Sequence, residues 1–104
     1  MAIYQLIEWE IAPGRQQDVL AMEAAFLAAV QRMGGKPVGG FMTAVGDVNR
    51  LMALIAYEDY AKYGKAGEIA QQDAELQRMA QASGALFSNI KTSILQPTPG
   101  STLK

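Results

Sequence analysis

The sequence predicts an α+β fold of the ferredoxin-like class, with a β-α-β-β-α-β order, a four-stranded antiparallel sheet and helices on one face. Three observations carry this prediction. Apolar residues alternate near the start, recur at helical spacing over residues 19–33, and then fill two runs separated by a turn. A chain of 104 residues is long enough for one two-layer core. We therefore expect one domain over residues 1–96 and a Pro-rich tail over 97–104.

The first expected strand covers residues 2–11. Apolar side chains lie on both sides of it, and only Glu8 and Glu10 make one side polar near its end. Pro13 and Gly14 then break the pattern, since this pair favours a turn. The strand therefore has no clearly solvated face over most of its length.

The first expected helix covers residues 14–33. Apolar residues recur there at steps of three or four, and alanine, which favours helix, fills many positions between them. Gly34–Gly35 follows at once and predicts a glycine cap at the carboxyl end.

A β-hairpin is expected over residues 38–57, with its turn at 45–48. An antiparallel strand in a small protein normally alternates apolar and polar residues, because water covers one face. Residues 51–56 contain no polar side chain. The second strand of the hairpin therefore requires cover on both faces.

Two weaker helical segments and a last strand complete the order. Residues 58–72 contain two glycines, so this helix is expected to be short or irregular, with Asp59 as its N-cap. Asp73 is expected to cap the next segment. Residues 88–95 alternate apolar and polar side chains and predict the final strand.

Composition limits the chemistry. The chain has no histidine and no cysteine, which excludes Ser-His-Asp and Cys-His catalysis and ordinary zinc or copper sites. The formal net charge is -1 with scattered Lys and Arg, so we expect no nucleic-acid or membrane partner. The first residues resemble no signal peptide. We expect a cytoplasmic protein without metal or cofactor, and no conventional enzyme.

A homodimer follows from the apolar strands. In a ferredoxin-like fold the helices cover only one face of the sheet, and the other face cannot be left to water if it is apolar. The simplest cover is the same face of a second copy, which gives a two-fold dimer around a shared interior. The alternative is a monomer whose tail folds over the sheet, but that tail is short and polar.

The chain also resembles the NIPSNAP family of the dimeric α+β barrel superfamily, over residues 3–99. The resemblance rests on the element order, on "PGR" after the first strand, on "GGFMTAVGDVNRLMALIAYED" in the hairpin and on "ILQPTP" near the end. It implies the ferredoxin-like fold and the barrel dimer. It implies no settled activity, because related barrels include cofactor-independent monooxygenases, dismutases, heme-degrading enzymes and proteins with no known reaction.

Four positions depart from the pattern of that family. Relatives often carry an acidic residue at the place of Gln5, Arg at Ile7, His at Ala53 and Trp at Ile55. By the two-residue alternation of a strand, these positions share a side with one another. We expect that side to face the barrel interior and the partner, with Met52, Leu54 and Ala56 facing the helices. The interior would then be more apolar than in relatives.

The residues of that row are the candidate ligand contacts. They are Gln5, Ile7, Trp9, Leu51, Ala53, Ile55 and Tyr57. Trp9 and Tyr57 would form an aromatic wall, with the Tyr57 hydroxyl as a hydrogen-bonding group, or would simply fill the packing between sheets. No catalytic residue is assigned.

Three functions remain open from the sequence. The first is a homodimer whose mostly apolar barrel cavity binds a small hydrophobic molecule. The second is a cofactor-independent enzyme, such as a monooxygenase or isomerase, in which Trp9, Tyr57, Gln5 or Asn49 would orient the substrate. The third is a structural or protein-interaction module whose barrel is filled by side chains. A cavity in the structure separates the first two from the third.

Overall fold

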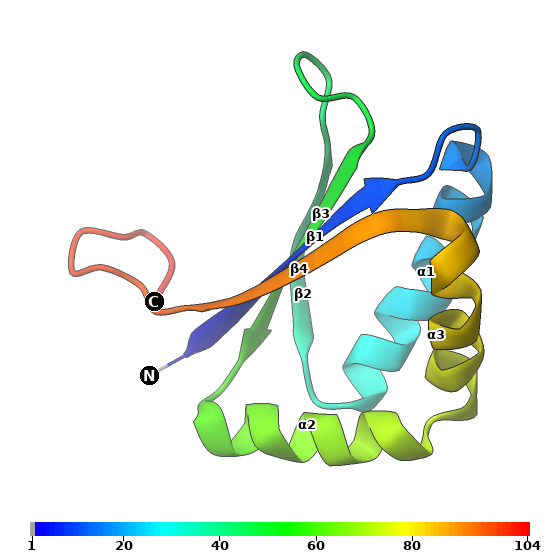
Figure 1. Ribbon diagram of the computed structural model, residues 1–104. Coiled ribbons are helices and arrows are strands. Elements are labelled where there is room, and N and C mark those ends of the chain that lie inside the picture. Colours follow the sequence, from blue (N-terminus) through cyan, green and yellow to red (C-terminus); the bar gives the residue numbers. More distant parts are fainter. Residues whose placement is uncertain (1) are drawn as a thin grey trace.

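The computed structural model describes residues 2–104 and has the expected order of strands and helices (Figure 1). Its elements, in chain order, are β1 (Ile3–Ile11), α1 (Gln16–Arg32), β2 (Lys36–Met42), β3 (Arg50–Tyr57), α2 (Tyr60–Gln72), α3 (Ala74–Leu86) and β4 (Phe87–Leu95). The four strands form one antiparallel sheet in the order β2-β3-β1-β4. The α+β prediction is therefore confirmed.

The helices form a layer on one side of the sheet. α1 and α3 lie side by side against it, and α2 crosses one end of the layer (Figure 1). No helix formed by residues 2–104 lies on the opposite face of the sheet. We call the first side the helix-facing side and the second the open face.

Local sequence signals explain where the helices begin and end. α1 ends in a Schellman motif, in which Gly34 has φ +92° and the Gly35 amide donates to the Val30 carbonyl at 3.0 Å. Asp59 caps α2 by accepting from the Lys62 amide at 2.8 Å. Asp73 caps α3 in the same way. All three caps were expected from the sequence.

The expectation that α2 is short or irregular is wrong. It is a continuous helix of 13 residues. Gly64 and Gly67 are exposed, and a side chain added at either would meet nothing within 4 Å. The glycines lower the intrinsic helix propensity, but Ala66 between them packs into the core at 2% exposure and holds the segment in place.

The hairpin also differs in detail. β2 ends at Met42 and β3 begins at Arg50, so the connection covers residues 43–49 instead of a short turn. The pairing of β2 with β3 shifts register between Pro37 and Gly39. Such a bulge inserts an extra residue and re-aims the strand after it.

The assignment of the two sheet faces was wrong. The main core cluster beneath the helices contains Ile3, Ile7, Ile55 and Tyr57, packed with Val30 of α1. The row expected to face a partner therefore faces the helices. Glu8 lies opposite Met52 across β1 and β3, so Met52, Leu54 and Ala56 share the open face with the carboxylates of β1.

The error has a physical cause. Both rows of β3 are apolar, so alternation alone does not say which row lies under the helices. The information was in β1, because Glu8 and Glu10 cannot lie beneath a helix layer without ion-pair partners. Antiparallel register then places Met52 on the same side as Glu8.

Candidate functional site

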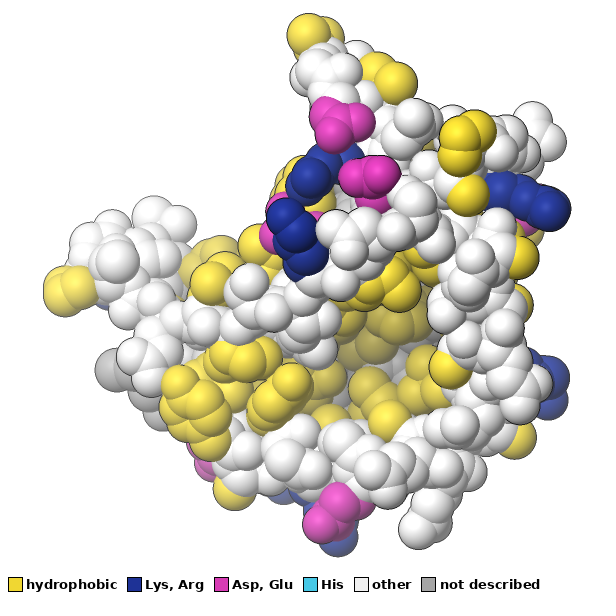
Figure 2. All heavy atoms as spheres, in the orientation of Figure 1, with side chains coloured by type: hydrophobic (Ala, Val, Ile, Leu, Met, Phe, Trp, Pro, Cys, Tyr) yellow, Lys and Arg dark blue, Asp and Glu magenta, His cyan; other side chains and the backbone are white. Residues whose placement is uncertain are grey.

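A cavity of about 520 Å³ lies between the sheet and the helix layer. Figure 2 shows hydrophobic side chains gathered in a hollow between these two layers. Its volume is within the range of small-molecule pockets, roughly 300–1,000 Å³. It is therefore the candidate functional site.

Every layer of the fold contributes to the lining. From the helices come Val19, Met22, Glu23, Phe26 and Leu27 of α1, and Leu76, Met79, Ala80 and Ser83 of α3. From the sheet come Trp9, Pro37, Val38, Gly39, Gly40, Leu51, Met52, Ala53, Phe87 and Ile90. Most of these side chains are apolar, so the cavity favours an apolar guest.

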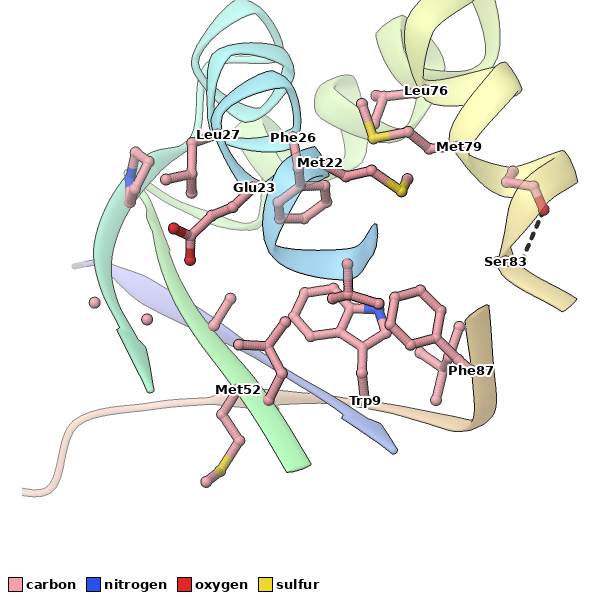
Figure 3. A pocket seen from close by; sticks show the side chains of 18 of the residues that line it. Trp9, Met22, Glu23, Phe26, Leu27, Met52, Leu76, Met79, Ser83 and Phe87 are labelled. Carbon is pink, nitrogen blue, oxygen red and sulfur yellow. Dashed lines mark hydrogen bonds between the residues drawn. The ribbon is translucent and has the colours of Figure 1, made fainter. Parts of the chain in front are cut away.

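An aromatic group forms the centre of this lining. Trp9 of β1 meets Phe26 of α1 edge to face, with ring centroids 5.5 Å apart, and lies 6.0 Å from the ring of Phe87 (Figure 3). These distances are those of favourable aromatic pairs. The three rings come from three different elements, so they tie β1, α1 and β4 together while presenting apolar surface to the cavity.

Helical spacing places the α1 side chains. Met22 and Phe26 are four residues apart, and Glu23 and Phe26 three apart, so they share one face of the helix. That face points at the sheet in Figure 3. The Met22 and Met79 side chains lie between the two helices and the aromatic rings. Methionine is flexible enough to adapt to guests of different shape.

In the part of the chain that the structure describes, Glu23 is the one ionisable residue of the lining. Its carboxylate reaches over β2, where an Oε2 atom lies 3.6 Å from the position that a Cβ on Gly40 would occupy. Its side chain points from α1 toward the sheet (Figure 3). Glu23 is itself exposed, so it marks the solvent-facing rim of the cavity.

The expected ligand contacts divide into two groups. Trp9, Leu51 and Ala53 line the cavity. Ile7, Ile55 and Tyr57 lie in the packed core beside it, and Gln5 is partly buried next to them on β1. The cavity thus lies between sheet and helices of one chain, not between two sheets as expected. Whether the lining residues contact a ligand stays a prediction.

Tyr57 is a core residue. It is 3% exposed, and its ring packs edge to face on Tyr63 at 5.3 Å. Burial raises the pKa of the Tyr57 phenol, and the neighbouring Tyr63 raises it further. The phenol therefore stays neutral at physiological pH and does not act as a base.

Other polar candidates make structural contacts. Asn49 accepts a hydrogen bond from Gln16 at 2.9 Å and so links the hairpin to the start of α1. Glu8 pairs with Arg50 at 3.5 Å on the open face. The Glu10 carboxylate accepts from the Ser88 hydroxyl at 2.8 Å. Within residues 2–104, no group of three or more Asp or Glu residues is arranged to hold a metal ion.

The sequence pattern does not single out the helix residues of the cavity. Met22, Phe26 and Met79 were recognised only as apolar positions of helices, and Glu23 was not singled out. A carboxylate between apolar neighbours on the inner face of α1 was the available signal, since a core-facing helix position is normally apolar.

Comparisons with known proteins agree with this fold. The family model described as NIPSNAP matches residues 4–102. A NIPSNAP family protein from Agrobacterium tumefaciens strain C58 superposes with a TM-score of 0.88 at 20% identity, over 100% of both chains. A NIPSNAP-like domain protein from Burkholderia xenovorans gives 0.82 at 22% identity, over 96% of this chain and 88% of that one.

A second Agrobacterium tumefaciens NIPSNAP family protein, described as of unknown function, has a TM-score of 0.86 at 16% identity, covering 99% of this chain and 94% of that one. No curated protein matches the sequence. At these identities the similarity defines the fold.

Among residues 2–104, no helix is long and apolar enough to cross a membrane.

Proposed function

The chain belongs to the NIPSNAP family, and from that premise we propose that it forms a homodimer that binds a small, mostly apolar molecule in the cavity of each protomer. The cavity of about 520 Å³ with its aromatic centre carries the proposal. A module filled by its own side chains would not need this space, because protein interiors normally leave few voids larger than a water molecule.

Two features of the lining support ligand binding over simple packing. Trp9, Phe26 and Phe87 present ring surface without filling the space between sheet and helices. Met22 and Met79 can change rotamer around a guest at little cost. Enclosing an apolar guest would remove from water the apolar side chains that now line the hollow.

The open face supports the dimer. Phe41 is 56% exposed and Leu95 41%, and Leu54 lies between the strands that carry them. The tail covers only one corner, where the Tyr4 hydroxyl donates to the Lys104 carbonyl at 3.2 Å and Tyr4 is buried. A second copy of the same face would cover the remaining apolar surface.

Ligand binding can be tested with Trp9 as the reporter, since it is the single tryptophan of the chain. The uncharged fluorophore N-phenyl-1-naphthylamine should bind saturably, brighten, and accept energy from Trp9. Ala80→Phe, which places a ring in the cavity from α3, should abolish the signal. Ala85→Phe is the matched control, because Ala85 is exposed on the same helix outside the lining.

Two results would contradict the binding proposal: no saturable binding to the wild-type protein, or equal binding by Ala80→Phe and Ala85→Phe. The dimer is tested separately by sedimentation velocity. We expect a dimer at micromolar concentration, and a monomer there would refute the covered open face.

A further inference from the structure

Glu23 is the feature of the cavity that the proposed function does not explain. An apolar cavity gains nothing from a carboxylate at its rim, yet the exposed Glu23 side chain reaches from α1 toward β2, where its Oε2 atom lies 3.6 Å from the position of a Cβ on Gly40 (Figure 3). Across residues 2–104, no lysine or arginine forms an ion pair with it. The carboxylate is therefore free to accept from a guest.

The floor below Glu23 is shaped for close approach. Gly39 and Gly40 lie on β2, which is an edge strand of the sheet. With no side chain at Gly40, the space within 3.6 Å of the Glu23 carboxylate is left to whatever enters the cavity. A donor group of a guest could reach the carboxylate there without displacing any side chain.

The charge of the lining selects the kind of head group. Among the described residues that line the cavity, Glu23 is the one with an ionisable side chain. Within residues 2–104, no basic side chain lines the cavity to neutralise an anionic guest. The rings of Trp9 and Phe26 lie close by, and aromatic faces also attract cations.

We propose that the cavity selects hydrophobic amines, with the protonated amino group against Glu23 and the apolar body against Trp9, Phe26 and Phe87. This inference rests on the proposed function and names the ligand class of the same site. A hydrophobic carboxylate, such as a fatty acid, is disfavoured because its charge would meet Glu23. The ammonium group donates three hydrogen bonds and suits a lone acceptor at the rim.

Three naphthalene probes of nearly equal size test the idea by isothermal titration calorimetry at pH 7: 1-naphthylmethylamine, 1-methylnaphthalene and 1-naphthylacetic acid. We expect the amine to bind about fivefold more tightly than the neutral compound, because Glu23 is partly in water and a pair there contributes up to about one kcal/mol. The acid should bind most weakly. Added salt should reduce the preference for the amine.

Variants assign the effect to the residue. Glu23→Gln keeps the size of the side chain and should bring amine affinity down to that of 1-methylnaphthalene. Glu68→Gln is the matched control, since Glu68 is exposed on α2 outside the lining; it should leave the order of affinities unchanged. In amide NMR spectra, the amine should shift Gly39 and Gly40 in the wild type and less in Glu23→Gln.

The outcomes separate this inference from the proposed function. If the neutral probe binds while amine and acid bind equally, or if Glu23→Gln keeps the preference, the inference fails and apolar binding stands. If none of the three probes binds, both fail.

Discussion

Both faces of the sheet carry apolar residues, and the open face carries Glu8 and Glu10 as well, yet the two faces are covered differently. On the helix-facing side, Ile55 is 1% exposed and Tyr57 3%, because α1 and α2 cover them. On the open face, Phe41 is 56% exposed and Leu54 is only partly covered. Apolar residues on a sheet face therefore show that the face needs cover, but not what covers it. Helices cover the helix-facing side and, in our proposal, a second chain covers the open face.

The cavity lies on the helix-facing side. It is built from α1, α3 and the sheet of one chain. The proposed dimer contact uses side chains of the other face. Met52 and Gly39 also border the cavity, but the Met52 side chain points away from it (Figure 3). Ligand binding in the cavity and dimerisation through the open face can therefore be disrupted separately by mutation.

The largest expected difference comes from adjacent residues of β3. Ile55→Asp would bury a charge in the core without a partner, and we expect a loss of more than about 4 kcal/mol and an unfolded chain. Leu54→Asp places the same charge on the open face. It should leave the fold intact and weaken the dimer at least about 100-fold. Circular dichroism and sedimentation velocity measure the two effects.

Two results with this pair of variants would contradict the assignment of the two faces. If the Leu54→Asp variant is unfolded and the Ile55→Asp variant is folded, then Leu54 lies beneath the helices and Ile55 lies on the open face. If the Leu54→Asp variant folds and remains a dimer, the dimer contact does not lie on the open face. Apolar probe binding by folded Leu54→Asp should match that of the wild type, because the cavity is complete within one chain.

A smaller difference is expected between two glycines on opposite faces. A Cβ at Gly35 would lie 2.9 Å from Ile55 Cγ2 and from Val30 Cγ1 in the packed core. Gly35→Ala should lower the free energy of unfolding by about 1–3 kcal/mol, the usual cost of overpacking. At Gly39 the new methyl would meet only the exposed Phe41 ring, at 3.0 Å, which can turn away.

Gly39→Ala is thus the matched control, and we expect it within about 1 kcal/mol of the wild type. Urea unfolding at one fixed protein concentration measures both variants, because dimer stability depends on concentration. If Gly35→Ala and Gly39→Ala lower the free energy of unfolding equally, the two faces are packed equally tightly, which contradicts the difference described above.

The smallest effect concerns Asp73, which joins the helices of the covered face. Its carboxylate accepts from the Leu76 amide at 3.1 Å and pairs with Arg32 of α1 at 2.9 Å. The hydrogen bond from Leu76, and then Arg32, lower the pKa of Asp73. The stabilisation is therefore complete above the ordinary pKa of about 4 and is lost as pH falls through the lower folded value.

Asp73→Asn keeps a capping side chain but removes the charge. We expect it to be less stable than the wild type at pH 7, with the gap narrowing as the pH falls below about 4. Urea unfolding at a series of pH values measures this gap. A gap that stays constant down to pH ~2 would mean that the carboxylate charge contributes nothing.

Much of the fold could be read from local patterns. Helical spacing placed α1, Gly34 and Asp73 marked helix ends, and the two apolar runs placed the hairpin. These signals act over a few residues, so they survive without tertiary information. The continuous helix α2 could not be read in this way, because the contacts of Ala66 with the core outweigh the propensity of its glycines.

The candidate site was only partly predictable for the same reason. Trp9, Leu51 and Ala53 were singled out as a row of a strand, and they do line the cavity. Their companions Ile55 and Tyr57 follow the same alternation but lie where the helices pack tightly on the sheet. The two-residue alternation of side chains tells which residues share one side of a strand. It does not tell how far the helices lie from the sheet at each of those residues.

Local patterns in the chain set the order of the elements, the helix ends, the lack of histidine and cysteine chemistry, and the need for cover on both sheet faces. The packing of the folded chain sets which apolar row lies under the helices, the cavity that α1 and α3 leave against the sheet, and the position of Glu23 over Gly40. The physical reason is that periodicity and caps are set by neighbours in the chain. The distance between the helices and the sheet, and the contacts between their side chains, depend on residues far apart in sequence.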